Sequence, residues 1–244
     1  ILTDAMGQLF YSISVAMGIM ITYGSYVPKD TDLNKSVTQI EFFDTSVAFL
    51  AGMMVIPAVF TFMGTEGLNA SGPSLMFVAL PKVFAAMGPV VGLIVGVLFF
   101  VTVFFAALTS SVSIMEAVVS CVMDRFQMSR KKATGLVSLL AAVIGILVCL
   151  GYNVLYFKAT LPNGTKAQIL DVLDYLSNYI LMPVVSIATC IFIGWIVKPK
   201  TIIEEVTHGG HKFGREKLYV VMIKFVTPVL LTLLLLQALG LIKF

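Results

Sequence analysis

Long apolar runs without charged residues are the feature that most restricts how this chain can fold. One of them reads "GPVVGLIVGVLFFVTVFFAAL", and about 20 such residues in a helix cross roughly 30 Å of hydrocarbon. Of the 244 residues, 59% are hydrophobic and 12% are charged, and the mean hydropathy is +0.99. The runs lack the alternation that is typical of barrel strands. The sequence therefore predicts an all-α integral membrane protein.

Six apolar segments are predicted to span the membrane. They lie at residues 5–27, 44–64, 89–123, 133–157, 168–197 and 217–242. Residues 66–87 begin with Gly, Asn, Ser and Pro and continue with a helix too short to cross, which predicts an external lid or a re-entrant segment. Residues 198–216 form a predicted cytoplasmic loop.

Basic residues in the loops set the predicted orientation. Alternation of the spans places eleven Lys and Arg residues on the predicted cytoplasmic side and four on the external side. Positive side chains are retained in the cytoplasm during insertion, which sets this orientation. Both chain ends are then predicted to be external. Because the chain opens on Ile1 without a signal peptide pattern, we expect it to be a fragment that lacks a preceding half.

Composition and motifs argue against enzymes and nucleic-acid binding. The two histidines, His208 and His211, lie in a Gly-rich loop without a cysteine or a nucleophile pattern nearby. The cysteines at 121, 149 and 190 fall in apolar runs without metal-ligand spacing, which favours a packing role. The basic residues are already explained by topology. We therefore predict neither an enzyme nor a nucleic-acid partner.

The stretch "YSISVAMG" places Ser12 and Ser14 inside the first span and ends on Gly18. Small and hydroxyl residues can serve close helix packing, with the hydroxyls bonded to carbonyls one turn earlier. They can also mark a broken helix whose exposed backbone groups coordinate an ion and a charged ligand. The stretch alone leaves both interpretations open.

A second polar cluster, "FFAALTSSVSIMEA", lies in the third span. Ala106, Thr109, Ser110 and Ile114 share one helix face, because they are three or four residues apart. Two hydroxyls and a backbone carbonyl are hard oxygen ligands suited to a small cation. Hydroxyls that only bond back to their own helix are the alternative.

Three carboxylates have two interpretations each. Asp44 opens the second span, with Ala48 one turn further on, and is either favoured by a helix N-terminus or buried deeper with a cation. Asp171 and Asp174 lie near the outer end of the fifth span. They are either a solvated helix start or part of a gate.

These clusters occur in a specific order along nearly the whole chain. The motifs are "GQLFYSISVAMGIMITYGSYV", "FFAALTSSVSIME", "DRFQMSRKKA", "LDVLDYL" and "EEVTHGGHKFGREKLYVVMIKFVTPVLL". Together they resemble the second half of a bacterial neurotransmitter:sodium symporter of the LeuT type. The resemblance implies the sixth to eleventh helices of that fold, with residues 1–197 as the second five-helix inverted repeat and 217–244 as a further helix. It also implies that the first of these helices is discontinuous at "YSISVAMG".

The resemblance assigns expected roles to individual residues. The sodium ligands are Ser12, Asp44, Ala106 through its carbonyl, Thr109 and Ser110. The substrate contacts are Tyr11, Ser12, Ser14, Met17, Ser110 and Ile114. The outer gate contains Asp174, and the network that closes the cytoplasmic path contains Ser25, Tyr26, Glu116 and Asp124. The equivalents of a chloride site are Gln8, Ser12, Asp44 and Ala48.

Two departures from the family pattern matter. Ala16 stands where glycine is common, so we expect a break that is shorter or differently placed, because alanine resists unusual dihedrals. Ala48 offers no hydroxyl, while Asp44 brings a fixed negative charge. A carboxylate beside sodium can replace chloride, which predicts chloride independence.

The resemblance implies sodium-coupled amino-acid symport by alternating access in a bacterial inner membrane. Met17, Tyr11 and Ile114 favour a large apolar or aromatic substrate. The expected partners are the substrate, Na⁺, the lipid bilayer and the missing N-terminal half. A sodium-coupled carrier of an amine or betaine and a non-transporting membrane subunit remain alternatives.

Overall fold

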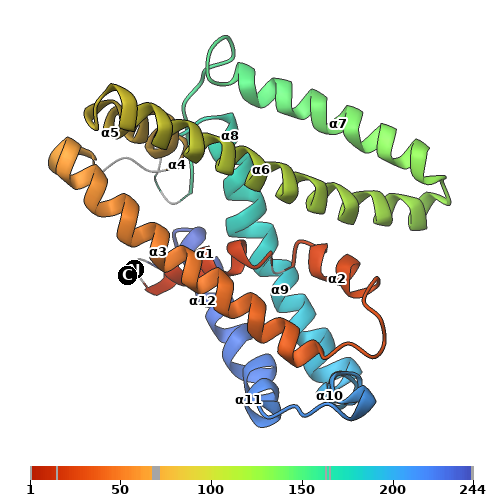
Figure 1. Ribbon diagram of the computed structural model, residues 1–244. Helices are drawn as coiled ribbons and strands as arrows, with labels where there is room; N and C mark the ends of the chain where they lie inside the picture. Colours follow the sequence, from red (N-terminus) through yellow and green to blue (C-terminus); the bar gives the residue numbers. More distant parts are fainter. Residues whose placement is uncertain (1, 15, 68–71, 163, 165, 243–244) are drawn as a thin grey trace. The chain divides into compact units, whose positions relative to one another are not determined.

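The protein consists of helices joined by short loops, together with one small β pair (Figure 1). The structure, a computed structural model, describes residues 2–14, 16–67, 72–162, 164 and 166–242. It divides into two units: Ile1–Thr38 with Ser113–Phe244, and Gln39–Val112. Two long helices, α3 (Leu33–Gly67) and α6 (Pro89–Phe126), pass from one unit into the other.

The first unit begins with two short helices in place of one span. These are α1 (Leu2–Ser12) and α2 (Ile19–Gly24), and Figure 1 shows the red ribbon interrupted between them. The last part of α6 turns back into α7 (Arg130–Leu150). Val119 on α6 packs against Ala133 and Val137 on α7, and this small core holds the hairpin together.

The remainder of the first unit is built around one long helical column. It contains α8 (Ile169–Asp174), η2 (Tyr175–Leu181), α9 (Met182–Ile191) and η3 (Phe192–Val197). A short connection holds α10 (Pro199–Val206) and the 3₁₀ turn η4 (His208–Gly210). A last helical run follows as α11 (Glu216–Val221), η5 (Met222–Val226) and α12 (Thr227–Ala238). Helices α9 and α12 pack against each other, and the buried Tyr175 hydroxyl donates to the Ala238 carbonyl at 2.5 Å.

The second unit contains most of α3, then α4 (Gly72–Ser74), η1 (Leu75–Ala79), α5 (Leu80–Ala86) and the first part of α6. Val59 from α3 and Leu80 and Val83 from α5 form its buried core. Residues 72–86 are therefore one short apolar helix within the predicted lid. Residues 68–71 of that lid lie outside the described residues.

Four of these segments are π-helical, with wider turns than an α-helix. They are η1, η2, η3 and η5, and each ends two residues before a proline: Pro81, Pro183, Pro199 and Pro228. Proline has no N–H, and its ring crowds the carbonyl four residues earlier. The turn before each proline widens in response, which is how π-helical turns enter otherwise regular helices.

The predicted all-α architecture is confirmed, with differences at the ends of the elements. Within the described residues, five helices are long and apolar enough to cross a membrane: Leu33–Thr65, Pro89–Phe126, Arg130–Leu150, Ile169–Val197 and Glu216–Ala238. Helix α3 begins at Leu33 and not near residue 44. Its first turns are helical, but their polar residues lie outside the apolar run on which the prediction relied. Helix α7 ends at Leu150, and turns occupy 151–155. The pair β1 (Ala159–Thr160) and β2 (Lys166–Ala167) was not predicted.

Candidate ion and substrate site

The break between α1 and α2 lies at the stretch that the sequence singled out. After Ser12 the backbone turns, with the Ser14 amide donating to the Tyr11 carbonyl at 3.0 Å. Ser14, Ala16 and Gly18 have φ values of 58°, 62° and 79°, all in the left-handed region. Left-handed residues at three alternate positions cannot continue a right-handed helix. The predicted discontinuity is therefore confirmed, while ion and ligand binding by its backbone groups stays a prediction.

Ala16 adopts the unusual dihedral even though it carries a side chain. The left-handed residues at 14, 16 and 18 lie within the quoted stretch, and the expectation of a shorter or differently placed break stays a prediction. Val15 lies outside the described residues. Such a conformation costs a non-glycine residue roughly 1 kcal/mol or more. The surrounding segment therefore holds Ala16 in a strained geometry.

We expect Ala16→Gly to stabilise the protein by about 0.5–1 kcal/mol, because glycine accepts a positive φ without strain. The matched control is Ala48→Gly in the regular helix α3, which should destabilise by about 1 kcal/mol. Thermal unfolding of the purified variants in one detergent measures both changes. Equal destabilisation by the two substitutions would contradict a strained Ala16.

Apolar and polar candidates for substrate contact lie around this break in the first unit. The exposed fractions of Tyr11 and Ile114 are 49% and 51%, and Met17 and Ser14 are half-buried. Ile19, the first residue of α2, is buried, and Gly18 approaches Ala117 of α6. The break is thus packed against the part of α6 that carries Ile114.

The proposed cation ligands on α6 lie in the second unit, on a regular stretch of helix. The Thr109 hydroxyl donates to the carbonyls of Phe105 at 3.1 Å and Ala106 at 3.0 Å. This is the back-bonding that the alternative interpretation expects. In this back-bond the hydroxyl acts as the donor. Ser110 is the next residue on the same exposed stretch.

Asp44 is not at a helix N-terminus. Helix α3 begins at Leu33, about three turns earlier, so the N-terminal interpretation of this carboxylate is wrong. Its side chain is half-buried within the second unit, and Ala48 follows one turn later on the exposed surface. Gln8, the remaining member of the predicted chloride-site set, is exposed on α1 in the first unit.

The structure joins Tyr26 and Glu116 of the predicted cytoplasmic network. The Tyr26 hydroxyl donates to Glu116 Oε1 at 2.6 Å, and Arg130 Nη2 donates to Glu116 Oε2 at 2.5 Å. Tyr23 and Ser113 form a further hydroxyl contact one turn away. Sequence reasoning missed Arg130, Tyr23 and Ser113. The sequence pattern indicated Arg130 only as one of the basic residues that set the membrane orientation. It is also the first residue of α7, directly after the turn that follows α6.

Ser25 and Asp124 make other contacts than those expected. The Ser25 hydroxyl donates to the carbonyl of Thr22 in its own helix at 2.6 Å. The backbone carbonyl of Asp124 accepts from the Gln127 side chain at 2.9 Å, and its side chain is exposed. Glu116 on α6 therefore connects Tyr26, which follows α2, to Arg130 at the start of α7.

Asp171 and Asp174, which also belong to the first unit, have different hydrogen-bond partners. Asp171 and Gln168 form a capping box at the start of α8. The backbone N–H of Gln168 donates to the Asp171 carboxylate at 3.0 Å. This agrees with the helix-start interpretation. Asp174 is exposed and accepts from the Asn178 amide at 2.5 Å. Asp174 thus stays available to a partner outside this cluster.

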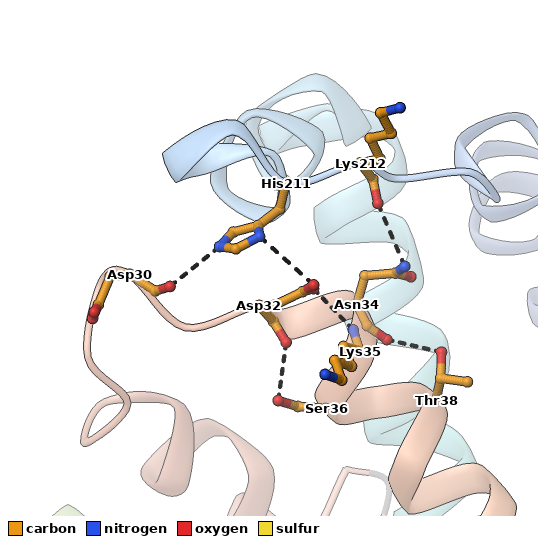
Figure 2. A network of polar contacts seen from close by, with 8 residues as sticks. All are labelled: Asp30, Asp32, Asn34, Lys35, Ser36, Thr38, His211 and Lys212. Carbon is orange, nitrogen blue, oxygen red and sulfur yellow. Dashed lines mark hydrogen bonds and ion pairs between the residues drawn. The ribbon is translucent and has the colours of Figure 1, made fainter.

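His211 ties together two loops that are far apart in the sequence. Figure 2 shows its ring between the Asp30 carbonyl, at 3.2 Å from Nε2, and the Asp32 carboxylate, at 3.6 Å from Nδ1. The Asn34 amide donates to the Lys212 carbonyl at 3.5 Å beside it. No group of three metal-binding side chains occurs within the described part of the chain. His211 therefore makes a structural contact between these two loops.

Comparison with known proteins places this geometry in context. The chain matches the Sodium:neurotransmitter symporter family over residues 1–243. It is 30% identical to the uncharacterized sodium-dependent transporter YhdH of Bacillus subtilis, over 98% of this chain and 51% of that protein. An uncharacterized sodium-dependent transporter of Haemophilus influenzae is 33% identical, over 93% of this chain and 47% of that protein.

A solved structure gives the same picture. The crystal structure of MhsT in complex with L-phenylalanine superposes with a TM-score of 0.82 at 32% identity, covering 97% of this chain and 51% of that one. The chain therefore spans about half the length of these three relatives.

Proposed function

Because the chain belongs to the sodium:neurotransmitter symporter family, whose members are transporters and not enzymes, we propose that it forms the C-terminal half of a sodium-coupled amino-acid symporter. The chain itself is a multi-pass membrane protein with the LeuT-type fold. The substrate is a large apolar or aromatic amino acid, and transport proceeds by alternating access. Both ends of the segment are external in a bacterial inner membrane.

The observation that carries this proposal is the broken first helix. A helix that is interrupted at membrane depth exposes backbone carbonyls and amides, which in transporters bind ions and charged substrate groups. Serine side chains at 12 and 14 lie at this break, and Met17 with Ile114 supplies apolar surface beside it. The similarity to a protein solved with L-phenylalanine supports an amino acid of that kind.

Sodium is the coupling ion in this proposal. Ser12 and Asp44 supply one sodium site, and the Ala106 carbonyl with Thr109 and Ser110 supplies the other. Tyr11, Ser14 and the Ser110 hydroxyl line the substrate. A cation beside the substrate carboxylate raises the affinity for substrate by the same factor as the substrate raises the affinity for sodium. The sodium gradient then drives uptake.

Access is controlled at two ends. Asp174 supplies the acidic side of an outer gate whose basic partner lies in the preceding half. Tyr26 and Glu116, with Ser25 and Asp124 nearby, close the cytoplasmic path. The hydrogen bonds of Glu116 to α2 and α7 support this role, because they hold the end of the broken helix beside the α6–α7 hairpin.

Sodium-dependent binding tests the proposal. Radiolabelled tryptophan, phenylalanine and leucine are added to the chain produced with its preceding half, with choline replacing sodium as the control. We expect binding only with sodium. Tryptamine and phenethylamine, which lack the carboxylate, should not compete. Equal competition by these amines would favour an amine carrier, and sodium-independent binding would overturn the proposal.

Thr109→Ala is expected to raise the sodium concentration for half-maximal substrate binding by about tenfold, because one oxygen ligand is lost. Thr109→Ser retains the oxygen and should remain within about twofold. Thr102→Ala is the matched control, since the Thr102 hydroxyl makes the same back-bond, to Leu98 at 2.8 Å, on the same helix. If Thr102→Ala shifted the sodium dependence as much, Thr109 would be only a packing residue.

Binding should not require chloride, because the Asp44 carboxylate supplies the negative charge beside sodium. Replacing chloride by gluconate is expected to leave sodium-dependent binding within about twofold of its value in chloride. In Asp44→Asn, which keeps the shape and removes the charge, chloride should become stimulatory. A wild-type protein whose binding disappears in gluconate would refute this assignment.

A further inference from the structure

A basic hollow lies in the first unit where two membrane spans reach their ends. It has a volume of about 530 Å³ and lies between η3 with α10 and η5 with α11. Its charged and aromatic lining consists of Trp195, Lys198, Lys200, Glu204, Glu216 and Lys224. The spans Ile169–Val197 and Glu216–Ala238 both terminate beside it. The hollow therefore sits at a boundary between apolar and polar surroundings.

Lys224 is the most unusual member of this lining, because it belongs to an apolar span. It follows the start of that span at Glu216 by eight residues, within η5. Its stem packs against Gly194, where an added Cβ would approach Lys224 Cγ at 3.4 Å, and its ammonium lies 5.8 Å from the centre of the Trp195 ring. A charged group at this depth requires a partner or a polar cavity.

The carboxylates of the lining leave positive charge uncompensated. Lys200 pairs with Glu204 at 3.6 Å, one turn apart on α10. Glu216 is exposed in the first turn of α11, where a helix N-terminus favours its charge. Across the described ranges, no carboxylate forms an ion pair with Lys198 or Lys224. Three lysines and two glutamates thus line the hollow, which leaves one net positive charge and leaves Lys198 and Lys224 without an ion pair among the described residues.

We propose that this hollow binds the phosphate group of an anionic phospholipid. The net charge of +1 on the lining matches the single negative charge of a phosphodiester, and basic pockets between helices near a membrane surface are suited to such headgroups. Trp195, which is 58% exposed, has the amphipathic character of residues that lie at the headgroup level. The Lys224 stem can lie along apolar surface while its ammonium reaches the phosphate. A dissolved phosphate ion has the same chemistry but gains nothing from the apolar side of the hollow.

Trp195 makes the proposal directly measurable, because it is the only tryptophan of the chain. The chain is reconstituted into phosphatidylcholine vesicles that contain increasing fractions of brominated phosphatidylglycerol, and quenching of its fluorescence is recorded. Brominated phosphatidylcholine at the same fractions is the neutral comparison. We expect phosphatidylglycerol to quench at lower fractions, with a preference of about fivefold for each lysine that contributes.

Variants identify the groups responsible. Lys224→Met keeps an unbranched stem and removes the charge, and should abolish most of the preference, as should Lys198→Gln. Lys224→Arg keeps the charge and should retain the preference, which guards against loss through misfolding. Lys131→Gln removes an exposed basic residue of the same charge on α7 and should change nothing. Circular dichroism checks that each variant keeps its helicity.

The outcomes are distinct. A preference for phosphatidylglycerol that depends on Lys198 and Lys224 supports a lipid site. If inorganic phosphate in detergent shifts Trp195 emission and competes with the lipid, the site takes dissolved phosphate and the lipid assignment is overturned. Equal quenching by the two brominated lipids in the wild-type protein would overturn the proposal entirely. None of these readouts depends on transport.

Discussion

Gly92→Ala should destabilise the second unit by about 3 kcal/mol, a large effect for one methyl group. A Cβ at this position would lie 1.9 Å from the Phe84 carbonyl oxygen and 2.8 Å from its carbon. These are backbone atoms, so no side chain can rotate away, and α5 would have to move from the start of α6. The substitution therefore breaks the close approach of these two helices.

The matched control lies in the same unit. Gly52 in α3 has nothing within 4 Å of an added Cβ, so Gly52→Ala should stabilise by about 0.5–1 kcal/mol through helix propensity. Loss of helicity during titration with sodium dodecyl sulfate gives both values. If the Gly92→Ala protein were as stable as the Gly52→Ala protein, the close contact between the Phe84 carbonyl and Gly92 would be contradicted.

Glu116→Ala should release α2 from the α6–α7 hairpin at a loss of about 2 kcal/mol, because two hydrogen bonds to a carboxylate disappear. The Glu116 side chain is only 16% exposed, whereas that of Arg130 is 62% exposed. The bond from Tyr26 should therefore carry more of the loss than the bond from Arg130, which water can replace. Hydrogen exchange of the α2 amides should accelerate by about thirtyfold.

A double-mutant cycle separates these two partners. Tyr26→Phe should reproduce more than half of the Glu116→Ala effect and add little to it, because both changes remove the bond between Tyr26 and Glu116. Asp124→Asn, on the same helix but with an exposed side chain, is the control and should leave exchange unchanged. Exchange that responded to Asp124→Asn as strongly would place the closing contact elsewhere.

Sequence patterns predicted the break in the first span better than they predicted helix ends. Ser14 and Gly18 signal flexibility, and the resemblance to transporters localised the break between them. The start of α3 was missed because the polar residues after Leu33 belong to the helix without belonging to an apolar run. Apolar composition reports what meets lipid, and hydrogen bonding decides where a helix begins.

The candidate site was predictable in its residue types but only partly in its contacts. Tyr26 and Glu116 meet as expected, yet Arg130 completes their cluster from another helix. Such a contact depends on how α6 and α7 pack through Val119, Ala133 and Val137, which no local pattern encodes. Asp171 is the opposite case, because its capping box involves only four consecutive residues and can be recognised in the local sequence.

The widened turns before the prolines change the phase of the helices that contain them. One residue beyond the regular count rotates everything downstream by about 100° about the helix axis. The long column contacts one helical run along its length, through α9 against α12 and through η3 against η5. Removing the extra residue of a widened turn would rotate a different stripe of the column toward that run.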